Sequence, residues 1–162
     1  MKILAFDQAS IKTAWSFFYN SDLVEYDLIH VKNEDNDLKF IEMLAEICKV
    51  INDKKPDVLI FEDVSLQTNV STLVQLSRIQ GCIISECIRQ GICYYIYKPS
   101  EWRKILKFTQ GRGVKRKQLK QQAIDYVSKT FNIHNVGDDL SEAICIGLAH
   151  IQERNNDFKE TK

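Results

Sequence analysis

Two acids near the start of a predicted helix, Asp139 and Glu142, have the type and spacing needed for metal chemistry. Apolar residues follow at helical spacing, so one face of this helix packs on a core and the two carboxylates lie side by side in its first turn. Two carboxylates on a rigid helix can hold a divalent cation if other segments add oxygen ligands. Asp-x-x-Glu is also a capping box, and this stretch alone favours that simpler interpretation.

Two further acids end predicted strands: Asp7 closes the segment 2–8 and Glu62 closes the segment 57–62. Ligands of open α/β sheets gather at the carboxyl ends of strands. If these strands are parallel neighbours, the two carboxylates meet there, and the last helix can lay its own pair across the same edge. Clustered carboxylates repel unless cations neutralise them, and hard oxygen ligands suit Mg²⁺ or Mn²⁺. Two such ions about 3.5–4 Å apart can activate water and stabilise the leaving oxygen of a phosphodiester. The predicted metal ligands are therefore Asp7, Glu62, Asp139 and Glu142.

The remaining pattern predicts one mixed α/β sheet of five strands, three antiparallel and two parallel, with helices on both faces. Aromatic and β-branched segments separated by short turns form the antiparallel part, and helix-strand units follow. The segment 92–97, ICYYIY, is interpreted as a buried strand like 57–62. Residues 1–151 form the predicted domain, and 152–162 form a polar tail that we expect to fray. The predicted strands are 2–8, 13–19, 23–31, 57–62 and 92–97. The first predicted helix follows the polar loop 33–37 and ends near residue 53, and the other helices cover 70–89, 99–106, 115–131 and 139–151.

Composition predicts a single globular domain in a reducing compartment. The chain has 162 residues, of which 44% are hydrophobic and 27% charged. No apolar run reaches membrane-spanning length, and the N-terminus has no signal-peptide pattern. The five cysteines are odd in number and lack a CxxC pair, so we interpret them as reduced hydrophobic residues in a cytoplasmic protein.

The basic residues gather in one segment although the net charge is zero. Residues 98–120 contain nine lysines and arginines and one acid, Glu101, which gives +8 there and leaves −8 for the rest. Such a face suits a polyanion, although a charge run of this kind is equally consistent with a solvated surface. Candidates for DNA contact here are Arg103, Lys107, Arg112, Lys115, Arg116 and Lys117; Gln67, Asn69 and Arg78 near the strand at 57–62 are secondary candidates.

Four stretches occur in order along the chain: LAFDQAS at 4–10, LIFEDVSLQTN at 59–69, LSRIQG at 76–81 and GDDLSEAICIGLAH at 137–150. Together they resemble the RuvC-type Holliday junction resolvases, in particular the phage-encoded branch found in lactococcal phages. The resemblance covers residues 1 to about 150. It implies an RNase H-like fold, a homodimer, and Mg²⁺-assisted paired nicks across a four-way DNA junction, with the four acids as metal ligands. It also implies a catalytic basic residue among Lys115, Arg116 and Lys117.

Three positions depart from the bacterial pattern of that family. DQA at 7–9 replaces DPG, Glu142 replaces an aspartate, and Ser65 with Leu66 stands where an aromatic residue wedges between junction bases. Because that aromatic residue is missing, we expect weaker base selectivity and a broader range of branched substrates.

The helix predicted at 70–89 is apolar on two sides, which suggests a partner chain. One side carries Leu73, Val74, Ile84 and Ile88, and the other carries Leu76, Ile79, Ile83 and Cys87. A second copy would supply the two-fold symmetry that paired cuts across a junction need.

Two other functions remain open. One is a junction-binding module of the same fold without catalysis. The other is a sugar-kinase- or actin-like ATPase. The ATPase is disfavoured because residues 7–10 contain no glycine for a phosphate loop and the chain is too short for two such domains. We interpret His150 as structural because two helical turns separate it from Glu142, and we assign Trp15 and Trp102 to the core or an interface.

Overall fold

The computed structural model describes residues 1–64 and 69–160, with side chains to residue 156. Five strands form one sheet in the order β3-β2-β1-β4-β5. Neighbouring strands β1, β2 and β3 are antiparallel, and β4 runs parallel to both β1 and β5. The fold class predicted from the sequence is confirmed. The strands are β1 (Lys2–Asp7), β2 (Lys12–Tyr19), β3 (Asp22–His30), β4 (Val58–Glu62) and β5 (Cys93–Tyr97).

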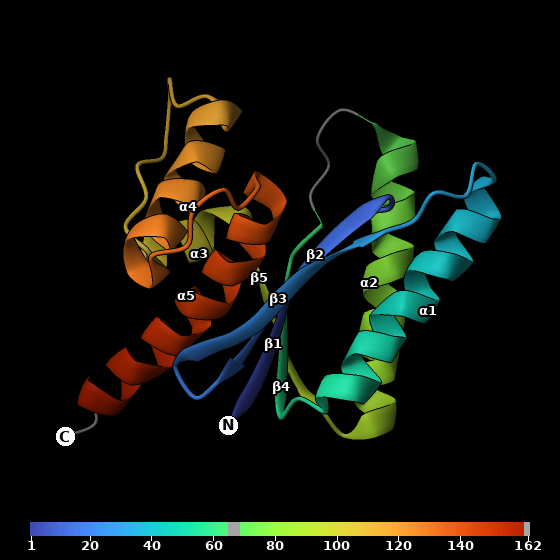
Figure 1. The fold of residues 1–162 in the computed structure, drawn as a ribbon, viewed down its shortest axis with the longest axis horizontal. Helices are drawn as coiled ribbons and strands as arrows, with labels where there is room; N and C mark the ends of the chain where they lie inside the picture. The colour runs from blue at the N-terminus through green and yellow to red at the C-terminus, as the bar shows by residue number, and fades with distance from the viewer. Residues whose placement is uncertain (65–68, 161–162) are drawn as a thin grey trace.

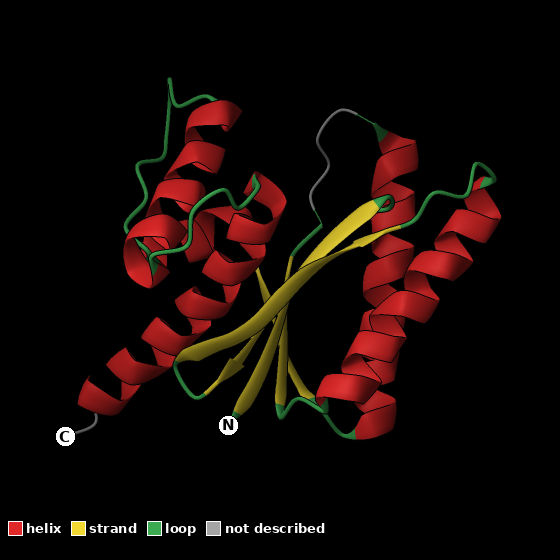
Figure 2. Cartoon of the chain, viewed as in Figure 1, coloured by secondary structure: helices red, strands yellow, loops and turns green. Residues whose placement is uncertain are grey.

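Helices cover both faces of the sheet (Figure 1). Two lie on one face and three on the other, and the sheet separates them in the secondary-structure view of Figure 2. The first pair is α1 (Asn36–Lys54) and α2 (Val70–Gln90); the opposite layer is α3 (Pro99–Ile105), α4 (Arg116–Phe131) and α5 (Asp138–Glu160).

Alternation along the central strands divides the core into two layers. Ile3 and Ala5 of β1 face α5, whereas Leu4 and Phe6 face α1 and α2. β4 alternates in the same way, which explains its continuous apolar sequence: both of its faces are buried. The same alternation places the last residue of each strand on the α5 side.

Helix α5 packs unusually close to the sheet. A Cβ atom added at Gly147 would lie 2.4 Å from the ring of Phe18, so only glycine permits this approach. The Ser16 hydroxyl on β2 donates a 2.9 Å hydrogen bond to the Ala143 carbonyl oxygen, which links the same two elements. These contacts at Ala143 and Gly147 hold the N-terminal half of α5 against the sheet.

One prediction about the fold is wrong. β5 is an edge strand, and Cys93, Tyr94, Tyr95 and Ile96 are exposed because the strand lies at the border of the sheet. Helix α5 extends to Glu160, past the predicted helix end at 151, and the fraying of 152–162 stays a prediction. The division into a domain and a tail stays a prediction.

The described residues contain no helix long and apolar enough to cross a membrane. All five cysteines are free; Cys87 and Cys145 are buried, and Cys93 is exposed on the edge strand.

Candidate metal centre at the carboxyl ends of two parallel strands

The register of the two central strands brings two of the predicted acids together. Phe6 of β1 pairs with Phe61 of β4, and each strand then ends in a carboxylate, Asp7 and Glu62. Both acids point to the α5 side because they continue the alternation of the core residues before them. The predicted parallel pairing of these strands is confirmed.

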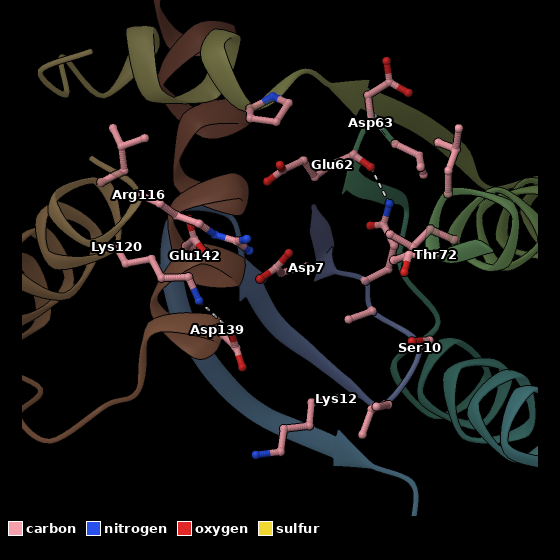
Figure 3. A pocket seen from close by; sticks show the side chains of 18 of the residues that line it. Asp7, Ser10, Lys12, Glu62, Asp63, Thr72, Arg116, Lys120, Asp139 and Glu142 are labelled. Atoms are coloured by element: carbon pink, nitrogen blue, oxygen red, sulfur yellow. Dashed lines mark hydrogen bonds and ion pairs between the residues drawn. The ribbon is translucent and has the colours of Figure 1, made fainter. Parts of the chain in front are cut away.

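Helix α5 adds the other two acids from its first turns. Oxygen atoms of Asp7, Asp139 and Glu142 lie within 4.8 Å of one another. Glu62 is not part of this closest set, but it lines the same cleft and faces it (Figure 3). Its Oε2 atom accepts a 3.1 Å hydrogen bond from the indole Nε1 of Trp102. The structure thus gathers all four predicted acids around one cleft of about 780 Å³.

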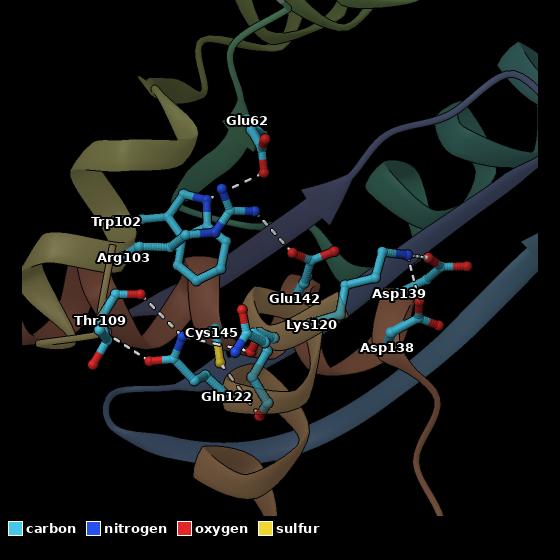
Figure 4. Close-up of polar contacts among 12 residues, drawn as sticks. Glu62, Trp102, Arg103, Thr109, Lys120, Gln122, Asp138, Asp139, Glu142 and Cys145 are labelled. Atoms are coloured by element: carbon cyan, nitrogen blue, oxygen red, sulfur yellow. Dashed lines mark hydrogen bonds and ion pairs between the residues drawn. The ribbon is translucent and has the colours of Figure 1, made fainter. Parts of the chain in front are cut away.

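The capping interpretation does not describe the contacts that these acids make. Glu142 is buried and its Oε1 atom accepts a 2.9 Å hydrogen bond from Nη2 of Arg103. Asp139 lies 3.4 Å from the Nζ atom of Lys120 (Figure 4). Both side chains therefore engage other elements.

The cluster is crowded with negative charge. Burial raises the pKa of Asp7 well above its ordinary range, and Glu62, Glu142 and Asp139 raise it further, whereas Lys120 lowers it. Burial likewise raises the pKa of Glu62 from 4.5 to about 7; Arg103 and the Trp102 hydrogen bond oppose this effect, and Glu142 adds to it. Carboxyl groups held so close ionise readily only when a cation is present.

The donors fit a hard divalent cation. Three carboxylate oxygens from two elements converge within 4.8 Å, and no sulfur or imidazole ligand belongs to this group. Mg²⁺ and Mn²⁺ prefer such oxygen donors, and Mg²⁺ keeps several waters that an open cleft can accommodate. Asp7, Asp139 and Glu142 can hold one such ion, with Glu62 beside them.

Three basic side chains approach the acids from α3 and α4. Arg103 pairs with Glu142, and its guanidinium lies 4.6 Å from the ring centre of Trp102. Arg116 lines the cleft and points toward the acids in Figure 3. Lys120 also lines the cleft and forms ion pairs with Asp138 and Asp139.

Lys120 is the site residue that sequence reasoning missed. It was counted in the basic segment but not proposed for the site. It follows Arg116 by four positions on α4, so the two share one helical face. That spacing was a usable indication once Arg116 was a candidate.

The structure separates the three basic candidates at the start of α4. All three are exposed, but only Arg116 lines the cleft, and Lys115 and Lys117 lie outside its lining. Lys115 is the N-cap residue of α4, so the helix begins one residue later than predicted.

The other DNA candidates are more dispersed. Asn69 lines the opposite wall of the cleft, where its side chain also accepts a 2.9 Å hydrogen bond from the Ser71 amide and so caps α2. Arg78 is exposed on α2 outside the cleft lining, and Lys107 and Arg112 are exposed between α3 and α4. Gln67, together with the departures at Ser65 and Leu66, lies outside the described residues.

The structural interpretation of His150 agrees with its surroundings. The ring is buried, its Nδ1 atom lies 2.9 Å from the Tyr97 hydroxyl, and the Tyr95 ring packs 4.5 Å away. Burial lowers its pKa to about 4, with a smaller effect of Arg154. Trp15 and Trp102 are buried, as predicted.

Comparisons with known proteins agree with this geometry. A family model described as "Crossover junction endodeoxyribonuclease RuvC" matches residues 8–150. The crossover junction endodeoxyribonuclease RuvC of Finegoldia magna is 27% identical over 158 residues, covering 93% of each chain. That of Caldicellulosiruptor saccharolyticus is 21% identical over 157 residues, covering 93% of this chain and 92% of the relative.

Solved structures show the same fold at lower sequence identity. Thermus thermophilus RuvC in complex with a Holliday junction substrate superposes with a TM-score of 0.78 at 12% identity, covering 96% of both chains. The yeast mitochondrial Holliday junction resolvase gives a TM-score of 0.57 at 11% identity, covering 98% of this chain and 83% of that one. Since the family model spans most of the sequence, this chain belongs to the RuvC family of crossover junction endodeoxyribonucleases.

Proposed function

We propose that this protein is a metal-dependent endonuclease that resolves four-way DNA junctions, and other branched DNA, by paired phosphodiester hydrolysis. The observation that carries the proposal is the convergence of Asp7, Asp139 and Glu142 within 4.8 Å in a cleft that Glu62 also lines. Both the RuvC of Thermus thermophilus and the yeast mitochondrial enzyme are described as acting on Holliday junctions, which supports this choice of substrate.

In this proposal the four acids would hold Mg²⁺, as two ions in the family's manner, and Mn²⁺ could substitute for it. The bound cations would polarise the scissile phosphate and lower the pKa of the attacking water. Asp7 is the proposed central ligand because it lies among the other three acids: Glu62, Asp139 and Glu142 all raise its pKa. Glu142 carries one more methylene than the family's aspartate and starts out paired with Arg103, so its charge is already partly compensated.

The basic side of the cleft is the proposed phosphate contact. Arg116 and Lys120 line the cleft directly beside the acids. Exposed Lys107, Arg112 and Lys117 extend positive charge outward from this wall. Phosphate contacts of this kind supply sequence-independent affinity that falls steeply with salt. Arg116 is the proposed catalytic member of the Lys115, Arg116 and Lys117 set because it alone of the three lines the cleft.

We also propose that two copies associate through α2. The side of this helix predicted to carry Leu73, Val74, Ile84 and Ile88 is only partly covered: Val74 and Ile88 are 43% and 68% exposed, and Val70 beside them is 65% exposed. Leu73 and Ile84 are half-buried, and the other side, with Ile79, Ile83 and Cys87, is buried in the core. Gly81 lies on the exposed surface of the same helix, and an added Cβ there meets nothing within 4 Å inside the chain. A small residue between apolar ones lets a neighbouring helix approach closely. Replacing Ile88 by Glu should yield a folded monomer in light scattering, and an unchanged dimer would exclude this interface.

Placement in the phage-encoded branch, with action in the cytoplasm of a bacterial host, is part of the same proposal. It rests on Gln8, Ala9 and Glu142, the described positions that depart from the bacterial pattern. The proposed broader range of branched substrates rests instead on Ser65 and Leu66 at the position of the family's aromatic residue, which lie outside the described residues.

A labelled four-way junction incubated with Mg²⁺ or Mn²⁺ tests the proposal. The intact protein should make symmetric nicks in opposite strands and none in chelator. Asp7→Asn should bind the junction with unchanged affinity and cut it at least a thousandfold more slowly. A junction-binding module without catalysis would bind in both cases and nick in neither.

A further inference from the structure

Gln8 is a buried polar residue at the acidic cleft, and the proposed function gives its side chain no role. It directly follows Asp7, is only 8% exposed and contributes to the lining of the cleft. Its Nε2 atom donates a hydrogen bond to the main-chain carbonyl oxygen of Glu62. Among the described residues, its Oε1 atom is buried without any hydrogen-bond partner.

The hydrogen bond to Glu62 fixes which way the carboxamide points. Only the NH₂ group of a glutamine can donate to a carbonyl oxygen, so the side-chain oxygen must face away from β4. The carboxyl groups of Asp7 and Glu62 line the same cleft. Once they are ionised around a cation they are acceptors only and cannot donate to this oxygen, whereas the cation or its water of hydration can satisfy it.

We propose that the side-chain oxygen of Gln8 is a neutral oxygen ligand of the cation held by Asp7, contacting it directly or through one of its waters. This inference rests on the proposed function, because it concerns the same cation. Divalent magnesium accepts carboxamide oxygens beside carboxylates and keeps part of its water shell. Through its other atom Gln8 also ties the carboxyl end of β4 to that of β1, so one side chain links the two strands that carry Asp7 and Glu62.

Calorimetric titration with Mn²⁺ in the absence of DNA tests the proposal on the full chain. Gln8→Met removes the oxygen while keeping the length of the side chain, and Gln8→Glu keeps an oxygen but loses the donor to Glu62. We expect Gln8→Met to weaken Mn²⁺ binding by about tenfold or more, as for other residues that support metal ligands. Gln8→Glu should bind at least as tightly as the native protein because it adds negative charge. Gln110→Met is the control: that side chain also donates to a main-chain carbonyl, 3.1 Å away at Ser100, but lies outside the acidic cleft.

The outcomes separate this inference from the proposed function. If Gln8→Met binds Mn²⁺ with native affinity, the side-chain oxygen has no role in holding the cation. If Gln8→Met and Gln8→Glu weaken Mn²⁺ binding equally, only the hydrogen bond to Glu62 matters, and the proposed role of the oxygen is also overturned. If Gln8→Met does not fold, weaker binding by Gln8→Glu than by the native protein overturns it instead. Asp7→Asn should lose Mn²⁺ binding in every case, and native binding by that variant would contradict the cation site itself.

Discussion

Removing the charge of Glu62 should stabilise the protein when divalent cations are absent. Burial is the main cause that raises the pKa of this residue from 4.5 to about 7. At about 1.4 kcal/mol for each pH unit, that difference corresponds to about 3 kcal/mol. Glu62→Gln keeps the shape of the side chain and an oxygen that can accept from Trp102 Nε1. It removes only the charge that the cleft disfavours.

The gain should depend on pH in a defined direction. The folded protein binds the Glu62 proton more tightly than the unfolded chain does, so the stabilisation from this protonated group is fully present below pH 4.5. It is lost as the pH rises through about 7. The native protein and Glu62→Gln should therefore be equally stable near pH 4.5, and the variant should be more stable by about 3 kcal/mol near pH 8.

Urea unfolding followed by circular dichroism in chelator measures this difference. In a domain of this size it also corresponds to roughly 6–12 °C in melting temperature. Saturating Mg²⁺ should narrow the gap, because a cation that binds only the folded native site stabilises it. Glu46→Gln is the control, since Glu46 is a half-exposed partner of Lys49 on α1, away from the acidic cleft. If Glu62→Gln is no more stable at pH 8, or if its advantage persists in acid, burial does not raise the pKa of Glu62 as described.

Three further variants test separate parts of the structure. Gly147→Ala should lower the free energy of unfolding by about 1–3 kcal/mol, because its methyl group meets the Phe18 ring; unchanged urea unfolding would contradict that close approach. Lys120→Met should tighten Mg²⁺ binding several-fold in calorimetry, since it removes a competing positive charge, and weaker binding would show that the lysine assists the cation. Arg116→Ala should reduce junction cleavage at least tenfold more than Lys117→Ala at equal protein stability, because only Arg116 lines the cleft. Equal effects of the two substitutions would contradict a catalytic role of Arg116.

The sheet and its acidic edge were predictable because each rests on a local pattern with a definite period. Alternation along β1 and β4 fixes the side to which Asp7 and Glu62 point, and helical spacing fixes the place of Asp139 and Glu142. Parallel pairing of neighbouring strands then brings the two sets together. The sequence could not show that Glu62 lies slightly apart, bonded to Trp102, since that contact depends on how α3 packs.

The features that the sequence did not predict depend on which surfaces of the folded chain meet. A local sequence pattern carries no information about such tertiary contacts. An apolar run predicts burial, but the edge position of β5 leaves Tyr94 and Tyr95 exposed. The polar composition after residue 151 gave no helix signal, although α5 continues to Glu160. Arg103 was predicted only as a DNA contact, and its pairing with Glu142 follows from the meeting of α3 with α5. Its role on DNA stays a prediction.

Anomalous X-ray scattering from crystals soaked in Mn²⁺ is the most direct test of the cation site formed by β1, β4 and α5. We predict a peak within about 2.5 Å of the carboxylate oxygens of Asp7 and of Asp139 or Glu142, and its loss in Asp7→Asn crystals. Absence of a peak at saturating Mn²⁺, or a peak that survives in Asp7→Asn, would contradict the account.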